Sequence, residues 1–181
     1  MRTLLLATLI ISATCCAAHD YGDAPASYGL PSTGGTQTCR LGATNTADTQ
    51  NPVTPAWTGD VDDGIVGAPP VWDSWSFNNS LTVRLENGGA YLLMWVDAND
   101  NGTFEDAERY EVNPGYFLPD NADYTFTGIK IHATQDFNHN AHNKVAVRIW
   151  AQDTIGGPPQ RNPGGHVYIG EIEDWLIDVE P

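Results

Sequence analysis

Residues 97–108 carry oxygen-bearing side chains at alternate positions, in the order DANDNGTFEDAE. This order matches the calcium-loop pattern D-x-[DN]-x-[DN]-G-x5-E at every required position. Calcium is a hard cation that takes about six to eight oxygen ligands, and a short loop with a glycine at its sharp turn can supply them. We therefore predict a calcium site. Its candidate ligands are Asp97, Asn99, Asn101, Thr103 (through its backbone carbonyl), Glu105 and Glu108.

The segments on either side of this loop predict strands rather than helices. The run 90–96, AYLLMWV, is short, apolar and aromatic, which is typical of a buried strand, and the run 107–112 roughly alternates. An EF-hand loop lies between two helices, so we expect a static clamp between two strands instead of a switch. The alternative is a plain hairpin that turns at Asn101-Gly102. That alternative leaves Asp97 and Glu108 at the metal-ligand offsets without an explanation.

Acidic residues also concentrate near positions 20–25, 59–65 and 170–175. Carboxylates that pack together repel one another unless a cation lies among them. A second metal site is therefore a candidate; the alternative is that each residue caps a turn or faces water. In a strand, Glu171 and Glu173 share one face and Asp174 takes the other. The candidate residues are Asp20, Asp23, Asp62, Asp63, Glu171, Glu173 and Asp174.

Arg148 interrupts the otherwise apolar run 144–150. An arginine that points into a core needs a carboxylate partner, because an unpaired buried charge is costly. We predict a structural ion pair between Arg148 and Glu173.

Residues 1–18 have the features of a cleaved signal peptide, with a basic Arg2, an apolar run over 4–11 and small residues up to Ala18. We expect export and a mature chain that begins at His19. The apolar run is too short to cross a bilayer, and no later run is longer. Lipid attachment through Cys15 or Cys16 is an alternative, although the preceding residues match a lipobox poorly.

The formal net charge is −15, from 8 basic and 23 acidic residues. Such an excess argues against binding to nucleic acid or to an anionic membrane. It suits a protein that gathers divalent cations, and it also keeps an exported protein soluble. After cleavage Cys39 is the single cysteine, so no internal disulfide is expected. A metal can then provide the stabilisation that disulfides give to many exported domains.

Strand-like segments recur along the chain with Asn-Gly and Pro-Gly turns between them, which predicts an all-β fold, an antiparallel and jelly-roll-like β-sandwich. We expect turns at 87–89 and 113–115, and a long surface excursion over 31–56. The predicted division is a signal peptide at 1–18, an extended segment packing on the sandwich at 19–79, and the sandwich at 80–181. The predicted strands are 80–85, 90–97, 107–112, 124–131, 144–150, 166–169 and 174–179.

The segment 170–175, GEIEDW, resembles the signature of the GEVED domain, with Ile172 in place of valine and Trp175 in place of tyrosine. The segment 93–104, LMWVDANDNGTF, is similar to the calcium-like loop of that family, and DYGDAPASYG at 20–29 and VDDGI at 61–65 are similar to its upstream elements. The resemblance implies a secreted bacterial β-sandwich module without established catalytic activity. Asn101 replaces the aspartate usual in the family, which should weaken the metal site.

These observations favour an exported, non-catalytic calcium-binding module with a structural, adhesion or ligand-binding role at or outside the cell surface. Its expected partner is an extracellular glycan or a surface protein, with no nucleic acid. Aromatic residues in loop-like contexts can either stack on sugars or pack into the core and its rim, and we favour packing because tryptophan is highly buried on average. These residues are Trp57, Trp72, Trp75 and Tyr116.

The alternative is a carbohydrate-active protein, either a glycan-binding module or an enzyme. A hydrolase would need two carboxylates in a cleft, and nothing in the sequence selects a pair. A terminal His19 with one further histidine would make a copper chelate. This resembles the histidine brace of lytic polysaccharide monooxygenases. The available partner histidines are His132, His139, His142 and His166.

Overall fold

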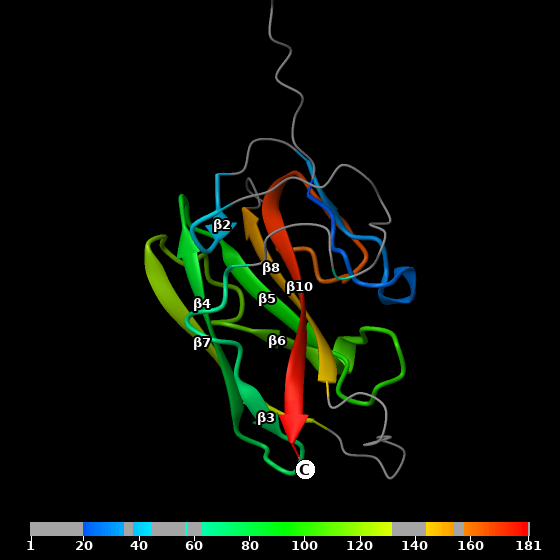
Figure 1. The fold of residues 1–181 in the computed structure, drawn as a ribbon. Helices are drawn as coiled ribbons and strands as arrows, with labels where there is room; N and C mark the ends of the chain where they lie inside the picture. Colours follow the sequence, from blue (N-terminus) through cyan, green and yellow to red (C-terminus); the bar gives the residue numbers. More distant parts are fainter. Residues whose placement is uncertain are drawn as a thin grey trace, which may run out of the picture.

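The computed structural model describes residues 20–34, 38–44, 57, 63–131, 144–153 and 158–180. Its strands form a five-stranded sheet in the order β3-β10-β8-β5-β6 and a three-stranded sheet in the order β2-β4-β7 (Figure 1). A two-stranded β1-β9 pair completes the structure. The predicted all-β sandwich is confirmed.

The two longest strands, β8 and β10, are neighbours inside the large sheet, and β4 is the central strand of the small sheet. No helix in the described ranges has the length and apolar character needed to cross a membrane. There are two short 3-10 turns in the described ranges: η1 (Ala26–Tyr28) precedes β1, and η2 (Asp106–Glu108) lies between β5 and β6. The strands are β1 (Ser32–Thr33), β2 (Arg40–Leu41), β3 (Val71–Asp73), β4 (Asn79–Glu86), β5 (Tyr91–Val96), β6 (Arg109–Glu111), β7 (Ala122–Ile129), β8 (Lys144–Asp153), β9 (His166–Val167) and β10 (Ile169–Glu180).

The large sheet is buried on both faces at its centre. Buried and more exposed residues alternate along β4 of the small sheet, whereas β5 and β8 are buried almost throughout because both of their faces are covered. The inner core, between the two sheets, includes Met94, Ile149 and Val83. An outer cluster on the opposite face contains Leu93, Trp95, Phe104, Ala146, Trp150, Val167 and Ile172. The continuous apolar run 90–96 reflects this double burial.

Three short strands in the N-terminal part of the chain were not predicted. Strands β1 and β2 lie within the expected excursion 31–56, and β3 precedes the first predicted strand. The β1-β9 and β3-β10 pairings are parallel, whereas the other strand pairs are antiparallel. Strands of two or three residues carry too little periodicity to be recognised from sequence. Residues 45–56 lie outside the described part of the chain.

Strand β10 is one continuous element, whereas the sequence predicted strands at 166–169 and 174–179. The acidic segment 170–175 lies within it and pairs with β8 from Ile169↔Asp153 to Asp178↔Lys144. Carboxylates are unusual in a buried central strand, so the sequence pattern did not predict a strand across residues 170–173. Their partners, described below, show how the strand accommodates them.

Candidate functional site

Loop 97–108 connects β5 to β6, which are antiparallel neighbours, so the predicted placement between two strands is confirmed. The loop starts where the backbone N–H of Asp97 donates to the carbonyl of Ala146 on β8, at 3.0 Å. It ends in the η2 turn, directly before Arg109 begins β6. The rigid ends of two sheet strands therefore fix both ends of the loop.

Asp97 organises the first half of the loop. Its side chain is buried, and Oδ1 accepts the backbone N–H of Asn101 at 3.0 Å while Oδ2 accepts that of Gly102 at 2.9 Å. Gly102 has a φ of +79°, a conformation that glycine adopts without steric cost. Tyr28 adds a third donor, because its hydroxyl lies 2.7 Å from Asp97 Oδ2.

The two asparagines of the loop hold its turns. Asn99 Oδ1 accepts the backbone N–H of Asn101 at 3.0 Å, and Asn101 Oδ1 accepts that of Thr103 at 2.9 Å. The amide nitrogen of Asn101 donates to Glu105 Oε1 at 3.0 Å. These bonds bring the predicted ligands at 97, 99, 101 and 105 into one small loop.

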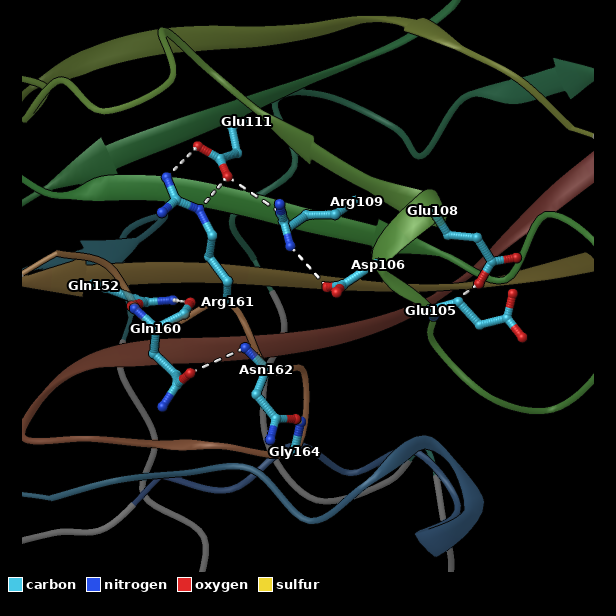
Figure 2. Close-up of polar contacts among 10 residues, drawn as sticks. All are labelled: Glu105, Asp106, Glu108, Arg109, Glu111, Gln152, Gln160, Arg161, Asn162 and Gly164. Atoms are coloured by element: carbon cyan, nitrogen blue, oxygen red, sulfur yellow. Dashed lines mark hydrogen bonds and ion pairs between the residues drawn. The ribbon is translucent and has the colours of Figure 1, made fainter.

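Glu108 closes the loop from the other end. Its Oε1 accepts the N–H of Ala98 at 2.9 Å and its Oε2 accepts that of Glu105 at 3.0 Å, so one carboxylate joins both ends of the loop. Figure 2 shows the bond between Glu105 and Glu108 beside β6. The side chain is buried, and burial raises the pKa of its carboxyl to about 7, with the nearby Asp97 charge adding to the effect.

The donor set of the loop fits a hard cation. Asp97 and Glu108 are both buried, and in the described ranges neither forms an ion pair with a basic side chain. Asp97 Oδ1 and both Glu108 oxygens each accept one N–H and keep a further lone pair for a metal, whereas Asp97 Oδ2 already accepts two hydrogen bonds. The described residues contain no group of three or more His, Cys, Asp or Glu placed to hold a metal. Calcium here would therefore depend on amide and carbonyl oxygens as well as the carboxylates.

The carboxylates of the acidic segment in β10 bind backbone amides of the N-terminal part of the chain. Glu173 Oε1 accepts the N–H of Asp63 at 3.0 Å and that of Gly64 at 2.8 Å. Glu171 accepts the N–H of Leu41 through a short hydrogen bond. These two glutamates share one face of β10, as predicted, and that face is the inner one. Each of them holds a different N-terminal segment against β10 by hydrogen bonds to its backbone.

The opposite face of β10 also forms hydrogen bonds with the N-terminal segment. Asp174 Oδ2 accepts the N–H of Ala24 at 2.8 Å, and the N–H of Ile172 donates to Asp20 Oδ2 at 2.7 Å. The structure thus distributes the acids of the proposed second metal site among separate backbone partners. Asp23 is buried near this face, Asp63 accepts the N–H groups of Ala43 and Thr44, and Asp62 lies outside the described residues.

The comparison with protein families bears on this arrangement. A family model described as the GEVED domain matches residues 91–178. Residues 91–178 are a GEVED domain. The match extends from β5 through the calcium-like loop to the acidic segment of β10, the two elements that carried the resemblance in the sequence. Searches of curated proteins and of solved structures found no match.

The buried arginine of the GEVED domain pairs with Asp174, so the predicted Arg148–Glu173 pair is wrong. Arg148 Nε lies 2.7 Å from Asp174 Oδ1, and Nη2 lies 2.7 Å from Oδ2. Directly opposed residues of antiparallel strands share a face, and Arg148 is opposed to Asp174 in the register. Glu173 points to the other face, where Trp175 Nε1 donates to its Oε2 at 3.0 Å.

Arg148 also connects the calcium-like loop of the GEVED domain to two other segments. Its Nη1 donates to the carbonyls of Tyr28 at 3.0 Å and Pro163 at 2.8 Å. Its guanidinium carbon lies 5.2 Å from the ring centre of Phe104, which in turn lies 4.7 Å from that of Tyr28. One buried cation therefore links β8, the N-terminal segment, loop 97–108 and the loop before β9.

The aromatic residues considered for sugar stacking divide into two groups. Trp72 belongs to the inner core between the two sheets, and Trp57 packs edge-on against Tyr28, with ring centres 6.0 Å apart. Trp75 and Tyr116 are 68% and 73% exposed, so they remain available to a partner. Of the histidines, His166 bonds the hydroxyl of Ser32 at 2.8 Å, and the others lie outside the described residues.

Sequence reasoning missed Tyr28 as a contributor to the loop. Its signal was present, because Tyr28 lies within the upstream element DYGDAPASYG that accompanies the GEVED signature. Spacing alone could not place it, since Tyr28 and Asp97 are 69 residues apart in the chain. The upstream element outside the family match is thus attached directly to the candidate metal loop.

Proposed function

We propose that this chain is an exported, non-catalytic calcium-binding module with a structural, adhesion or ligand-binding role at or outside the cell surface. Calcium would be held by Asp97, Asn99, Asn101 and Glu108, with Thr103 through its carbonyl and Glu105 completing the set. The GEVED match supports an extracellular module. The leader-like residues 1–18 and the net charge of −15 support export and attraction of cations.

The observation that carries the calcium proposal is the pair of buried carboxylates in one loop. Asp97 is 1% exposed and Glu108 is 6% exposed, and no basic side chain in the described ranges neutralises either of them. A buried carboxylate without a cation is disfavoured in its charged form, as the raised pKa of Glu108 reflects. A bound calcium ion would supply the missing positive charge and hold the loop closed.

In this proposal calcium stabilises a fixed structure rather than switching between two. Both ends of the loop continue into paired strands of the large sheet, which leaves no hinge between helices that could open. Extracellular modules commonly use sites with dissociation constants of about 10⁻⁴–10⁻³ M, and a ligand set with two asparagines suits that range.

The test is metal analysis of the purified mature protein, followed by thermal unfolding in EGTA and in excess calcium. Calcium should raise the melting temperature, because it binds the folded state alone. Asp97→Ala should remove most of that rise, whereas Asp153→Ala, at an exposed bond to Thr38, should retain it. A melting temperature that does not respond to EGTA or calcium would refute the proposal.

A glycan-binding role is the second candidate, and the exposure of Trp75 and Tyr116 favours it. Exposed aromatic rings can stack on the apolar face of a sugar. The related proposal of a copper enzyme depends on His19, which lies outside the described residues. Intact-mass analysis of the exported protein would show whether His19 is terminal, and copper titration would then test that site.

A further inference from the structure

A groove of about 640 Å³ lies beside the calcium-like loop, on the face of the large sheet that carries the outer cluster. Loop 97–108, strand β6 and the loop before β9 each contribute to its walls. Ligand sites commonly have volumes of roughly 300–1,000 Å³, so the groove can hold one sugar ring. Its lining residues are Phe104, Asp106, Arg109, Arg161, Asn162 and Pro163.

Two arginines meet in this groove, although the whole chain has only 8 basic residues against 23 acidic ones. Figure 2 shows both of them bound to Glu111. Glu111 accepts Arg109 Nε at 3.2 Å, and it accepts Arg161 Nε at 2.8 Å and Nη2 at 3.2 Å. The Arg161 guanidinium, with Arg109, lowers the pKa of the Glu111 carboxyl, which stays charged and fixes both cations side by side.

The groove retains hydrogen-bond donors after these bonds are made. Arg161 Nη1 and Arg109 Nη2 take no part in the bonds to Glu111. Arg109 Nη1 binds Asp106 at 2.8 Å, but the Asp106 side chain is 86% exposed. Exposed ion pairs contribute little, so an incoming anion can replace Asp106 at low cost. The two arginines are balanced by Glu111 and Asp106, so displacement of Asp106 would leave the groove with spare donors and with one uncompensated positive charge.

The loop that carries Arg161 is held in place before any ligand arrives. Gln152 on β8 exchanges two hydrogen bonds with the backbone of Gln160, at 2.8 Å and 2.7 Å. The side chain of Gln160 accepts the N–H of Asn162 at 3.0 Å, and Asn162 Oδ1 accepts that of Gly164 at 3.0 Å (Figure 2). A site that is already ordered loses less entropy on binding.

We propose that this groove binds a uronic acid residue of an acidic polysaccharide, with Arg161 and Arg109 holding its carboxylate. Guanidinium groups match carboxylates through paired, charge-assisted hydrogen bonds. Pro163, with the small exposed part of the otherwise buried Phe104, would contact the C–H face of the sugar ring, and the Asn162 amide would bind a hydroxyl. The inference rests on the proposed function in taking the chain as a ligand-binding module outside the cell, and it does not require calcium.

Isothermal titration calorimetry with a galacturonate trimer, a neutral galactose trimer and a tetraglutamate peptide tests this site. The acidic trimer should bind. Arg161→Gln should weaken that binding by roughly 10- to 100-fold, as expected for hydrogen bonds to a charged group. Arg84→Gln is the matched control, because the Arg84 side chain is similarly exposed (36% against 41% for Arg161) and also binds carboxylates, those of Glu86 and Asp123, but on the small sheet. Arg84→Gln should leave binding unchanged.

Four results would overturn the proposal: no binding of the acidic trimer, equal binding of the neutral trimer, preference for the peptide, or an affinity unaffected by Arg161→Gln. Melting temperatures of both variants are recorded so that loss of folding is not counted as loss of binding. Titrations are run in EGTA and in calcium on the same samples used for thermal unfolding. Failure of the calcium proposal and failure of this one therefore give separate signatures.

Discussion

Arg148 and Asp174 face each other across strands β8 and β10, joined by two bonds of 2.7 Å with both side chains completely buried. Desolvation of two charges is costly, and the geometry offsets it with further donors and acceptors. Arg148 also donates to two backbone carbonyls, and Asp174 also accepts the N–H of Ala24. The pair is therefore one of the buried contacts that hold the N-terminal segment against the GEVED domain.

We expect Asp174→Asn to lower the free energy of unfolding by about 3–5 kcal/mol, because it leaves the Arg148 charge buried without a partner. Urea denaturation measures this change. Asp178→Asn is the control on the same strand, since the Asp178–Lys144 pair is 3.0 Å long but roughly half exposed. It should cost less than about 1 kcal/mol. Equal losses for the two variants would contradict a special role for Arg148–Asp174.

Tyr28→Phe should lower the free energy of unfolding by about 1.5–3 kcal/mol, because the variant loses a hydrogen bond to the buried carboxylate of Asp97. Tyr124→Phe is the comparison, since the Tyr124 hydroxyl donates to the neutral carbonyl of Pro119 at an exposed position. We expect a loss near 1 kcal/mol or less there. A larger loss for Tyr124→Phe would argue against the attachment of the N-terminal segment to the loop.

Glu173 should make stability depend on pH. Burial raises the pKa of its carboxyl from 4.5 to about 7 in the folded protein. The folded state then binds more protons than the unfolded state between these values, so its stabilising contribution is complete below pH 4.5 and is lost as the pH rises through about 7.

Denaturant unfolding from pH 4.5 to pH 8 measures this effect on the wild type and on Glu173→Gln. As the pH rises across this range, we expect the free energy of unfolding of the wild type to fall by about 1–3 kcal/mol more than that of Glu173→Gln. This size follows because one pKa unit corresponds to about 1.4 kcal/mol. The difference between the two proteins removes the contribution of Glu108, whose pKa is also raised by burial. Parallel pH profiles would refute the assignment to Glu173.

Glu108→Gln should abolish most of the stabilisation by calcium, because it removes the carboxylate that closes the loop at both ends. At a calcium concentration about 100 times the dissociation constant, that stabilisation is about 2.7 kcal/mol in the wild type. Asp106→Asn in the same loop is the control, since Asp106 is 86% exposed and directed at Arg109. Retention of the full calcium effect in Glu108→Gln would place the metal elsewhere.

The features that could be predicted from the sequence are those that depend on neighbouring residues. The alternating oxygens of 97–108 and the apolar run before them lie within a few residues of one another, so the pattern predicted a strand-flanked loop that the structure contains. The alternation on β10 likewise placed Glu171 and Glu173 on one face and Asp174 on the other. Period-two geometry determines these positions without any reference to the rest of the chain.

The partners of those side chains depend on how distant parts of the chain come together in the fold. The register of β8 against β10 places Arg148 opposite Asp174, so Arg148 forms its ion pair with Asp174 and not with Glu173. The N-terminal segment packs against loop 97–108, so the Tyr28 hydroxyl can bind Asp97. Chain folding also brings Arg109 and Arg161 to the same carboxylate across 50 residues of sequence separation from Glu111 to Arg161. The loop and the strand faces could be predicted from the sequence alone, because they follow from local backbone geometry. Register and long-range packing assigned the partners, since a contact between distant segments depends on the whole fold.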